Sequence, residues 1–190
     1  MDISNLKTAD ILLSTGDATV SAVIRAGTAS RFSHAALYAG NNEIIESIGQ
    51  GVVRQPLARA ISDDTLVAVY RRIQMSEQQG NQVVRYAAMQ IGKPYDQAGA
   101  VGAAASSPTG FALIVFGGPF GQSITGAGLG ADIMNRLNPE RSFFCSELVA
   151  LAFDHAGVSL GRGAASSTPA DISSAHVLNQ VGYLKGGAPA

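Results

Sequence analysis

Several residue types are scarce in this chain, and each scarcity argues against a class of protein. Cys145 is the single cysteine among 190 residues, which excludes an internal disulfide and a metal site built from several thiolates. Charged residues make up 14% with a net charge of −1, and the basic residues are dispersed apart from Arg71-Arg72, so no nucleic-acid-binding surface is indicated. The apolar run 111–116 is far shorter than the roughly 20 residues that span a bilayer.

Hydrophobic residues make up 46% of the chain, enough for one globular domain over residues 1–190 with a substantial core. Residues 97–131 differ from the rest: they hold nine of the 22 glycines and no charged residue. We interpret them as an apolar insertion, either a packed loop with helical pieces or a mobile lid or lipid-facing surface. The Gly/Ala/Pro tail 186–190 is expected to be flexible.

The pattern of hydrophobic and turn residues predicts an α+β fold, a small antiparallel sheet packed against helices. The expected strands are 10–14, 33–39, 43–47, 52–54 and 65–71. The expected helices are 20–26, 76–91 and a helix that begins at Cys145 and ends near 156–157. A further short helix is expected to begin at Thr168-Pro169.

Cys145 stands at the start of its predicted helix, after a turn-like segment. The unpaired N–H groups and positive dipole end of a first turn favour a thiolate, the form of cysteine that attacks carbonyl groups. Cysteine is also among the most buried residue types, and here it shares a helical stripe with Leu148, Val149 and Ala152. A nucleophile and a small core residue are both consistent with this segment.

A cysteine nucleophile normally needs a histidine base. His155 lies about 15 Å along the same helix at 1.5 Å per residue, out of reach of Cys145, and His176 lacks a structural cue for such a role. His34 is the better candidate, because the small residues Ala35 and Ala36 follow it on a predicted strand and leave room for the helix of Cys145 or for a substrate.

Glu46 is a candidate to orient that histidine. If the hairpin loop is the three residues Gly40-Asn41-Asn42, the numbers of opposed residues sum to 82, and Glu46 lies diagonal to His34 on the same face. A two-residue loop would place Glu46 on the opposite face, where it would be a solvated charge.

Four segments, Ser33–Tyr38, Ile45–Ser47, Gly92–Asp96 and Phe144–Val149, occur in an order that resembles the circularly permuted NlpC-type cysteine peptidases, in particular their YiiX-like branch. In ordinary NlpC peptidases the cysteine helix precedes the histidine strand, whereas here it follows. The resemblance covers about residues 10–172, interrupted by the insertion, and implies a papain-like fold.

The resemblance implies that Cys145 is the nucleophile, His34 the base and Glu46 the acid that orients His34. It also implies substrate contacts near these groups, which we assign to Tyr38, Tyr95 and Ser146. No metal ion or other cofactor is expected.

On this basis we expect a cysteine hydrolase that cleaves amide bonds, foremost in peptidoglycan stem peptides. The alternatives are a lipid or acyl-ester hydrolase or acyltransferase that uses residues 111–120 as a membrane-contacting surface, and a binding module without activity. Residues 1–7 lack the features of a Sec signal peptide, so synthesis in a bacterial cytoplasm is expected, followed by export through a signal-independent route if the target is the periplasmic wall. An antibacterial effector of this kind would require an immunity or secretion partner.

Overall fold

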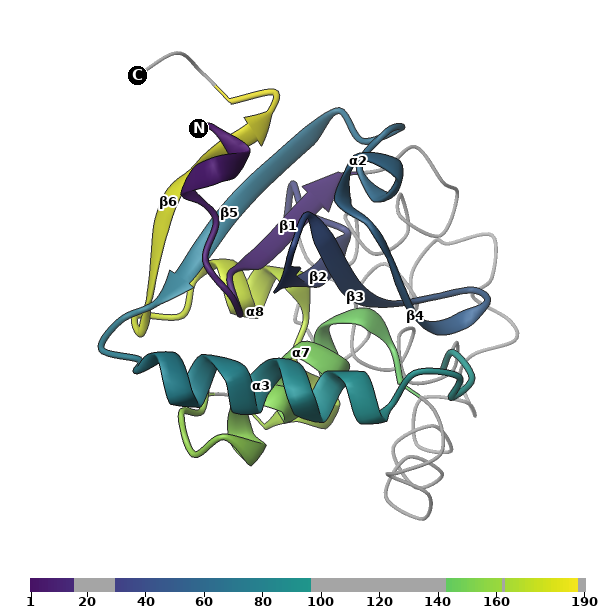
Figure 1. Cartoon of the computed structure of the whole chain (residues 1–190), viewed down its shortest axis with the longest axis vertical. Coiled ribbons are helices and arrows are strands. Elements are labelled where there is room, and N and C mark those ends of the chain that lie inside the picture. Colours follow the sequence, from purple (N-terminus) through teal and green to yellow (C-terminus); the bar gives the residue numbers. More distant parts are fainter. Residues whose placement is uncertain (16–29, 97–142, 162, 188–190) are drawn as a thin grey trace, which may run out of the picture.

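Six strands form one antiparallel sheet in the order β4-β3-β2-β1-β5-β6 (Figure 1). The structure, a computed structural model, describes residues 1–15, 30–96, 143–161 and 163–187. The strands are β1 (Ile11–Thr15), β2 (His34–Gly40), β3 (Glu43–Ile48), β4 (Gly51–Pro56), β5 (Leu66–Arg72) and β6 (Leu178–Lys185). The predicted α+β class and antiparallel sheet are confirmed.

Two longer helices, α3 (Glu77–Met89) and α7 (Cys145–His155), pack side by side along one face of this sheet (Figure 1). Their apolar residues, such as Val83 and Leu148, join alternate strand residues such as Leu37 in the main core. The short helical elements are η1 (Ile3–Asn5), α2 (Leu57–Ala60), η2 (Ala164–Ser166) and α8 (Pro169–Ser173).

The opposite face of the sheet has its own, smaller core, to which α2 contributes Leu57. Leu57 packs there with strand residues that include Ala36, Tyr38 and Ile44. Successive side chains of β2 point to opposite faces of the sheet, so they contribute alternately to the main core and to the smaller core.

The β2–β3 hairpin has the predicted register but a different turn. Ala36 is paired with Glu46, as the sum of 82 requires. The turn itself is the two residues Asn41-Asn42, both with positive φ (53° and 57°), which asparagine tolerates. A bulge between Tyr38 and Gly40 adds the extra residue and restores the register that a three-residue loop would give.

The boundaries of the three predicted helices that lie in the described residues agree with the structure to within about two residues. Ser76 caps α3, where its hydroxyl accepts the N–H of Gln79 at 3.2 Å, and Thr168 caps α8 with Pro169 in the first turn. Strand β6 was not predicted. It pairs with the edge of β5 through two register shifts and contains Gly182, and both features weaken a strand pattern.

Three predicted features fall wholly or partly outside the described residues: the helix 20–26, the insertion 97–131 and the end of the tail 186–190. Among the described residues, no helix combines the length and the apolar character needed to cross a membrane.

Candidate active site

Cys145 is the first residue of α7, and hydrogen bonds on both sides hold it in place. The hydroxyl of Ser47 in β3 donates to the carbonyl of Phe143 at 2.6 Å, which fastens the chain just before the helix. After it, the hydroxyl of Ser146 donates to the carbonyl of Ser167 at 2.7 Å. The start of α7 is thereby fixed between the sheet and the segment before α8, and the thiol is 3% exposed.

His34 and Glu46 meet across the β2–β3 hairpin. Nε2 of His34 lies 2.5 Å from Oε2 of Glu46, with the imidazole side chain 25% exposed and the glutamate side chain 5% exposed. The second carboxylate oxygen accepts a hydrogen bond from the side-chain amide of Gln55. Because Nε2 is occupied by Glu46, Nδ1 is the imidazole nitrogen available to Cys145, which hydrogen-bonds to His34.

The electrostatics of this group favour separated charges. Burial by itself lowers the pKa of His34, but its hydrogen bonds to Cys145 and Glu46 outweigh burial and raise that pKa well above the ordinary value. Burial by itself raises the pKa of Cys145, but the hydrogen bond and charge of His34, with the backbone N–H groups of Ala35 and Ser146, lower it. The arrangement can hold a thiolate–imidazolium pair.

Glu46 supplies the third charge. Burial alone raises its pKa, but the hydrogen bond and charge of His34 and the hydrogen bond of Gln55 lower it below the ordinary value. An ionised carboxylate on Nε2 orients the ring and stabilises the imidazolium.

Tyr95 lies beside the start of α7, and its predicted contact with a substrate stays a prediction. It forms an isolated parallel bridge with Phe143, and its ring packs against Phe144. Burial, followed by the negative charges of Cys145 and Asp96, raises the pKa of Tyr95 well above its ordinary value. The phenol therefore keeps its proton and can donate a hydrogen bond near the thiolate.

The other two expected substrate contacts, Tyr38 and Ser146, are buried and have hydrogen-bond partners within the protein. Tyr38 is 7% exposed in the smaller core, and its hydroxyl accepts the N–H of Asn42 at 3.2 Å in the hairpin turn. It shares the face of His34 but lies four residues along the strand, about 13 Å away at 3.3 Å per residue. Ser146 is fully buried and engaged with Ser167. A substrate contact by either side chain stays a prediction, and the contacts that the structure shows are structural.

Three polar residues near His34 were not singled out from the sequence. Gln55 contacts Glu46 as described, and the β3–β4 turn could have indicated it. Ser14 is the cross-strand partner of His34 on β1 and hydrogen-bonds to Asp64. Burial raises the pKa of Asp64, opposed by this hydrogen bond and by the charge of His34.

Glu147, in the first turn of α7, was also missed. Its carboxyl accepts the N–H of Phe144 at 3.4 Å and is 2% exposed. Burial raises its pKa to about 8, with a smaller contribution from Asp96. At neutral pH this carboxyl is mainly protonated, so it caps the helix without placing a full charge there.

The remaining histidines take no part in this site. The ring of His155 stacks against Tyr86 with centroids 4.6 Å apart, and His176 is exposed in the turn before β6.

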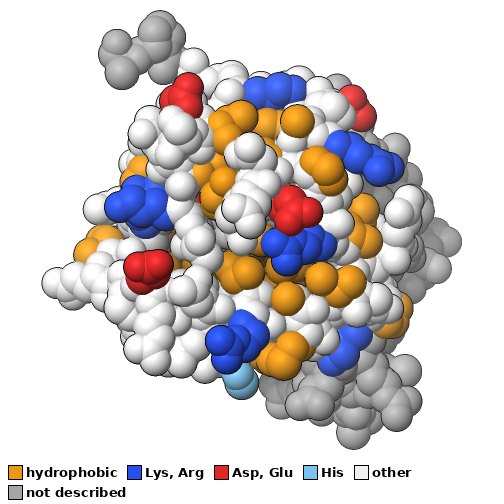
Figure 2. Space-filling model, in the orientation of Figure 1, with side chains coloured by type: hydrophobic (Ala, Val, Ile, Leu, Met, Phe, Trp, Pro, Cys, Tyr) orange, Lys and Arg blue, Asp and Glu red, His pale blue; other side chains and the backbone are white. Residues whose placement is uncertain are grey.

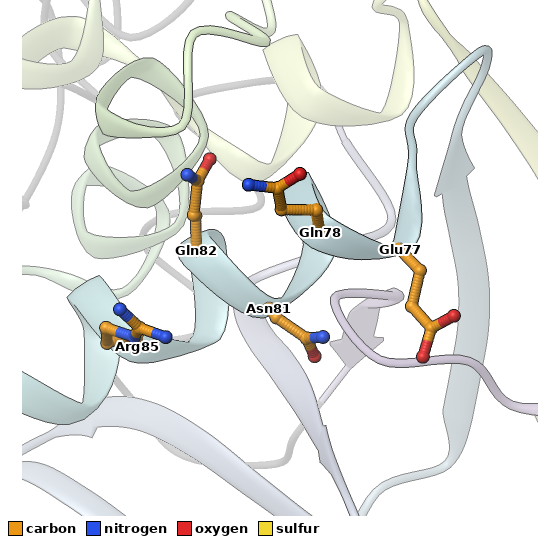
Figure 3. A pocket seen from close by; sticks show the side chains of 5 residues that line it. All are labelled: Glu77, Gln78, Asn81, Gln82 and Arg85. Atoms are coloured by element: carbon orange, nitrogen blue, oxygen red, sulfur yellow. The ribbon is translucent and has the colours of Figure 1, made fainter.

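Two further surface features of the described residues lie apart from this site. Figure 2 shows charged side chains of both signs scattered over one face. A shallow hollow is lined by five polar side chains of a single helix, α3 (Figure 3): Glu77, Gln78, Asn81, Gln82 and Arg85. It contains none of the residues discussed above. Within the described ranges, no group of three or more His, Cys, Asp and Glu side chains could hold a metal ion.

Comparisons with known proteins identify the fold and the family. The profile of a family described as permuted papain-like amidase enzymes, YaeF/YiiX, C92 family, matches residues 5–100, which include His34 and Glu46. A crystal structure described as that of the metalloprotein yiiX from Escherichia coli O157:H7 superposes with a TM-score of 0.67 at 18% identity, covering 94% of this chain and 98% of that one. A search of curated proteins returned no match. The shared fold is the expected papain-like one with the histidine strand ahead of the cysteine helix, and the chain belongs to the C92 family of permuted papain-like amidases, which are cysteine peptidases.

Proposed function

We propose that this amidase acts through Cys145 as nucleophile, His34 as acid and base, and Glu46 as the group that orients His34, and that its substrate is the peptide stem of peptidoglycan. The observation that carries the catalytic assignment is the hydrogen-bonded series from Cys145 to His34 to Glu46 at the first turn of α7.

The first half-reaction forms an acyl-enzyme. The thiolate sulfur of Cys145 attacks the amide carbonyl carbon, and the developing oxyanion is stabilised by the backbone N–H of Cys145 and the positive end of α7. The imidazolium of His34 gives its proton to the amide nitrogen as the carbon–nitrogen bond breaks, and the amine leaves.

The second half-reaction consumes one water. Neutral His34 takes a proton from the water, whose oxygen attacks the thioester carbon. The carbon–sulfur bond then breaks, the acid product leaves, and the thiolate–imidazolium pair is restored. Glu46 keeps its charge throughout and stabilises the imidazolium.

The choice of peptidoglycan rests on the resemblance of the four motifs to NlpC-type peptidases. A role as an antibacterial effector, delivered to the periplasm and neutralised by a partner in the producing cell, is an extension of the same resemblance. Among the alternatives, a lipid or acyl-ester substrate would use the same nucleophile.

Mass spectrometry of reaction products tests the substrate. Wild type and Cys145→Ala are incubated in parallel with purified peptidoglycan fragments and with phospholipid vesicles. New wall fragments with wild type alone are the expected result, and their masses locate the bond. Fatty acid release that depends on Cys145, with no wall product, would overturn the peptidoglycan proposal.

A further inference from the structure

The two oxygens of the Glu46 carboxylate have different partners, and only one of them is the catalytic histidine. Oε2 contacts Nε2 of His34, while Oε1 accepts a hydrogen bond from the side-chain amide of Gln55. Glu46 as a whole is 4% exposed, so water does little to hold its second oxygen. Gln55 therefore provides the contact that prevents the carboxylate from rotating away from the imidazole.

The register of β3 and β4 explains why Gln55 can do this. Ile44 is paired with Gln55 and Glu46 with Val53, which places Gln55 diagonal to Glu46 on the same face of the sheet. Diagonal neighbours in an antiparallel pair are about 7–8 Å apart, within reach of two long side chains.

The chemistry of the amide suits this position. Lysine or arginine here would offer Glu46 a competing cation and weaken its hold on the imidazolium, whereas a neutral donor satisfies Oε1 and leaves the charge directed at His34. The neighbouring cation, Arg54, lies on the other face and pairs with Glu43 at 2.8 Å. Because successive side chains of β4 point to opposite faces, Glu46 meets the neutral amide of Gln55 and not the charge of Arg54.

We infer that Gln55 is a positioning residue of the catalytic group: it fixes and keeps ionised the carboxylate that orients His34, and through it maintains the Cys145 thiolate. This inference rests on the proposed roles of Cys145, His34 and Glu46.

The test is the pH dependence of Cys145 alkylation by iodoacetamide, which needs no substrate. The lone cysteine makes the label specific to this site. Three forms are compared with wild type: Gln55→Leu, Gln55→Glu and, as a matched control, Gln78→Glu on the exposed surface of α3. Thermal unfolding verifies that each is folded.

In Gln55→Leu, the lost donor raises the pKa of Glu46, so the acid limb of the alkylation profile moves to higher pH. The rate at pH 6 is expected to fall about tenfold or more, the range for losing a hydrogen bond to a charged group. In Gln55→Glu, the new carboxyl donates in place of the amide while it holds a proton. Its profile should therefore follow wild type at low pH and show one additional ionisation as pH rises.

If both Gln55 variants give the same alkylation profile as wild type and Gln78→Glu, the inference about Gln55 is overturned, but the proposed catalytic group is not. A wild-type thiol that titrates near the ordinary value of about 8.5 would instead overturn the proposed catalytic group, whatever the Gln55 variants do. The two failures are therefore distinguishable.

Discussion

Two buried carboxylates, Asp10 directly before β1 and Glu46 in β3, each contact a basic side chain, but the two pairs have different functions. Asp10, 1% exposed, accepts two hydrogen bonds of 2.7 and 2.6 Å from the guanidinium of Arg71, while Glu46 contacts the imidazole of His34 at 2.5 Å. A guanidinium keeps its charge at every pH that a folded protein meets, whereas an imidazole exchanges protons near neutrality. The first pair can only fasten β1 to β5; the second can also transfer a proton.

The difference lies in what surrounds each base. Arg71 also donates to the carbonyl of Asn5 at 3.0 Å, so its contacts are with fixed backbone and a fixed charge. The free nitrogen of His34 faces Cys145, a group that can itself ionise. A buried ion pair becomes a candidate for catalysis when one partner titrates and a nucleophile lies on its other side.

Removing the nucleophile should have the largest effect on activity. Cys145→Ala deletes the thiol while leaving both carboxylate pairs in place. We expect kcat for amide cleavage to fall at least about 10⁴-fold, as for other nucleophile deletions, with cooperative unfolding retained. Product formation from peptidoglycan fragments measures this, and substantial activity in the variant would contradict the assignment of the nucleophile.

Glu46→Gln makes the titrating pair neutral at nearly constant shape. The imidazolium loses its counter-charge, so the pKa of His34 falls and less thiolate is present at neutral pH. We expect kcat/KM to drop about 10²-fold or more, by analogy with loss of the orienting acid in other triads. Iodoacetamide alkylation of Cys145 at pH 6 to 7 should slow in parallel; unchanged alkylation would show that Glu46 does not act on the site.

Asp10→Asn is the corresponding change in the structural pair. It removes the charge that Arg71 requires and should lower the free energy of unfolding by about 2 kcal/mol, less than for a fully buried pair because Arg71 is 27% exposed. Denaturant unfolding measures the loss. Glu43→Gln, which breaks the exposed pair with Arg54, is the control and should cost under about 0.5 kcal/mol. The pH profile of Cys145 alkylation in folded Asp10→Asn should match that of wild type. A shifted profile would contradict the claim that the Asp10–Arg71 pair has only a structural role.

Glu147→Gln is expected to have the smallest effect on activity, with a definite pH dependence of its stability. The folded pKa of Glu147, about 8, lies above the ordinary 4.5, so the folded protein holds a proton that the unfolded chain loses between these values. Wild-type stability therefore falls as pH rises across this window. The variant keeps an acceptor for the Phe144 N–H without this penalty, so by pH 8 it should gain up to about 4 kcal/mol over wild type, less the cost of burying the new amide. The free energies of unfolding of wild type and Glu147→Gln are measured at pH 5 and pH 8. If their difference is the same at both pH values, Glu147 is not a buried, protonated carboxyl.

Local patterns predicted much of the fold and the central residues of the candidate site. The stripe of Leu148, Val149 and Ala152 and the caps Ser76 and Thr168 specify helices that the structure contains. The β2–β3 register was right for a different reason, because a bulge replaced the third loop residue. A bulge depends on how the two strands pair along their whole length, and no local residue pattern predicted this bulge.

What the sequence analysis missed depends on contacts between segments. Gln55 is diagonal to Glu46 only because the turn at Gly49-Gln50 pairs Ile48 with Gly51, a register that the turn residues could have indicated. Ser146 was expected near the substrate because it follows Cys145. One residue along a helix turns the side chain by about 100°, and here that direction leads into the interior.

The most direct test of the account is the titration of the Cys145 thiol, followed by ultraviolet thiolate absorbance from acid to alkaline pH with Cys145→Ala as baseline. The thiolate should be present at pH 6, well below the ordinary thiol pKa of about 8.5, and Glu46→Gln should move its appearance to higher pH. A wild-type thiol that ionises only near 8.5, with the same curve in Glu46→Gln, would contradict the claim that His34 and Glu46 maintain a reactive thiolate at the start of α7.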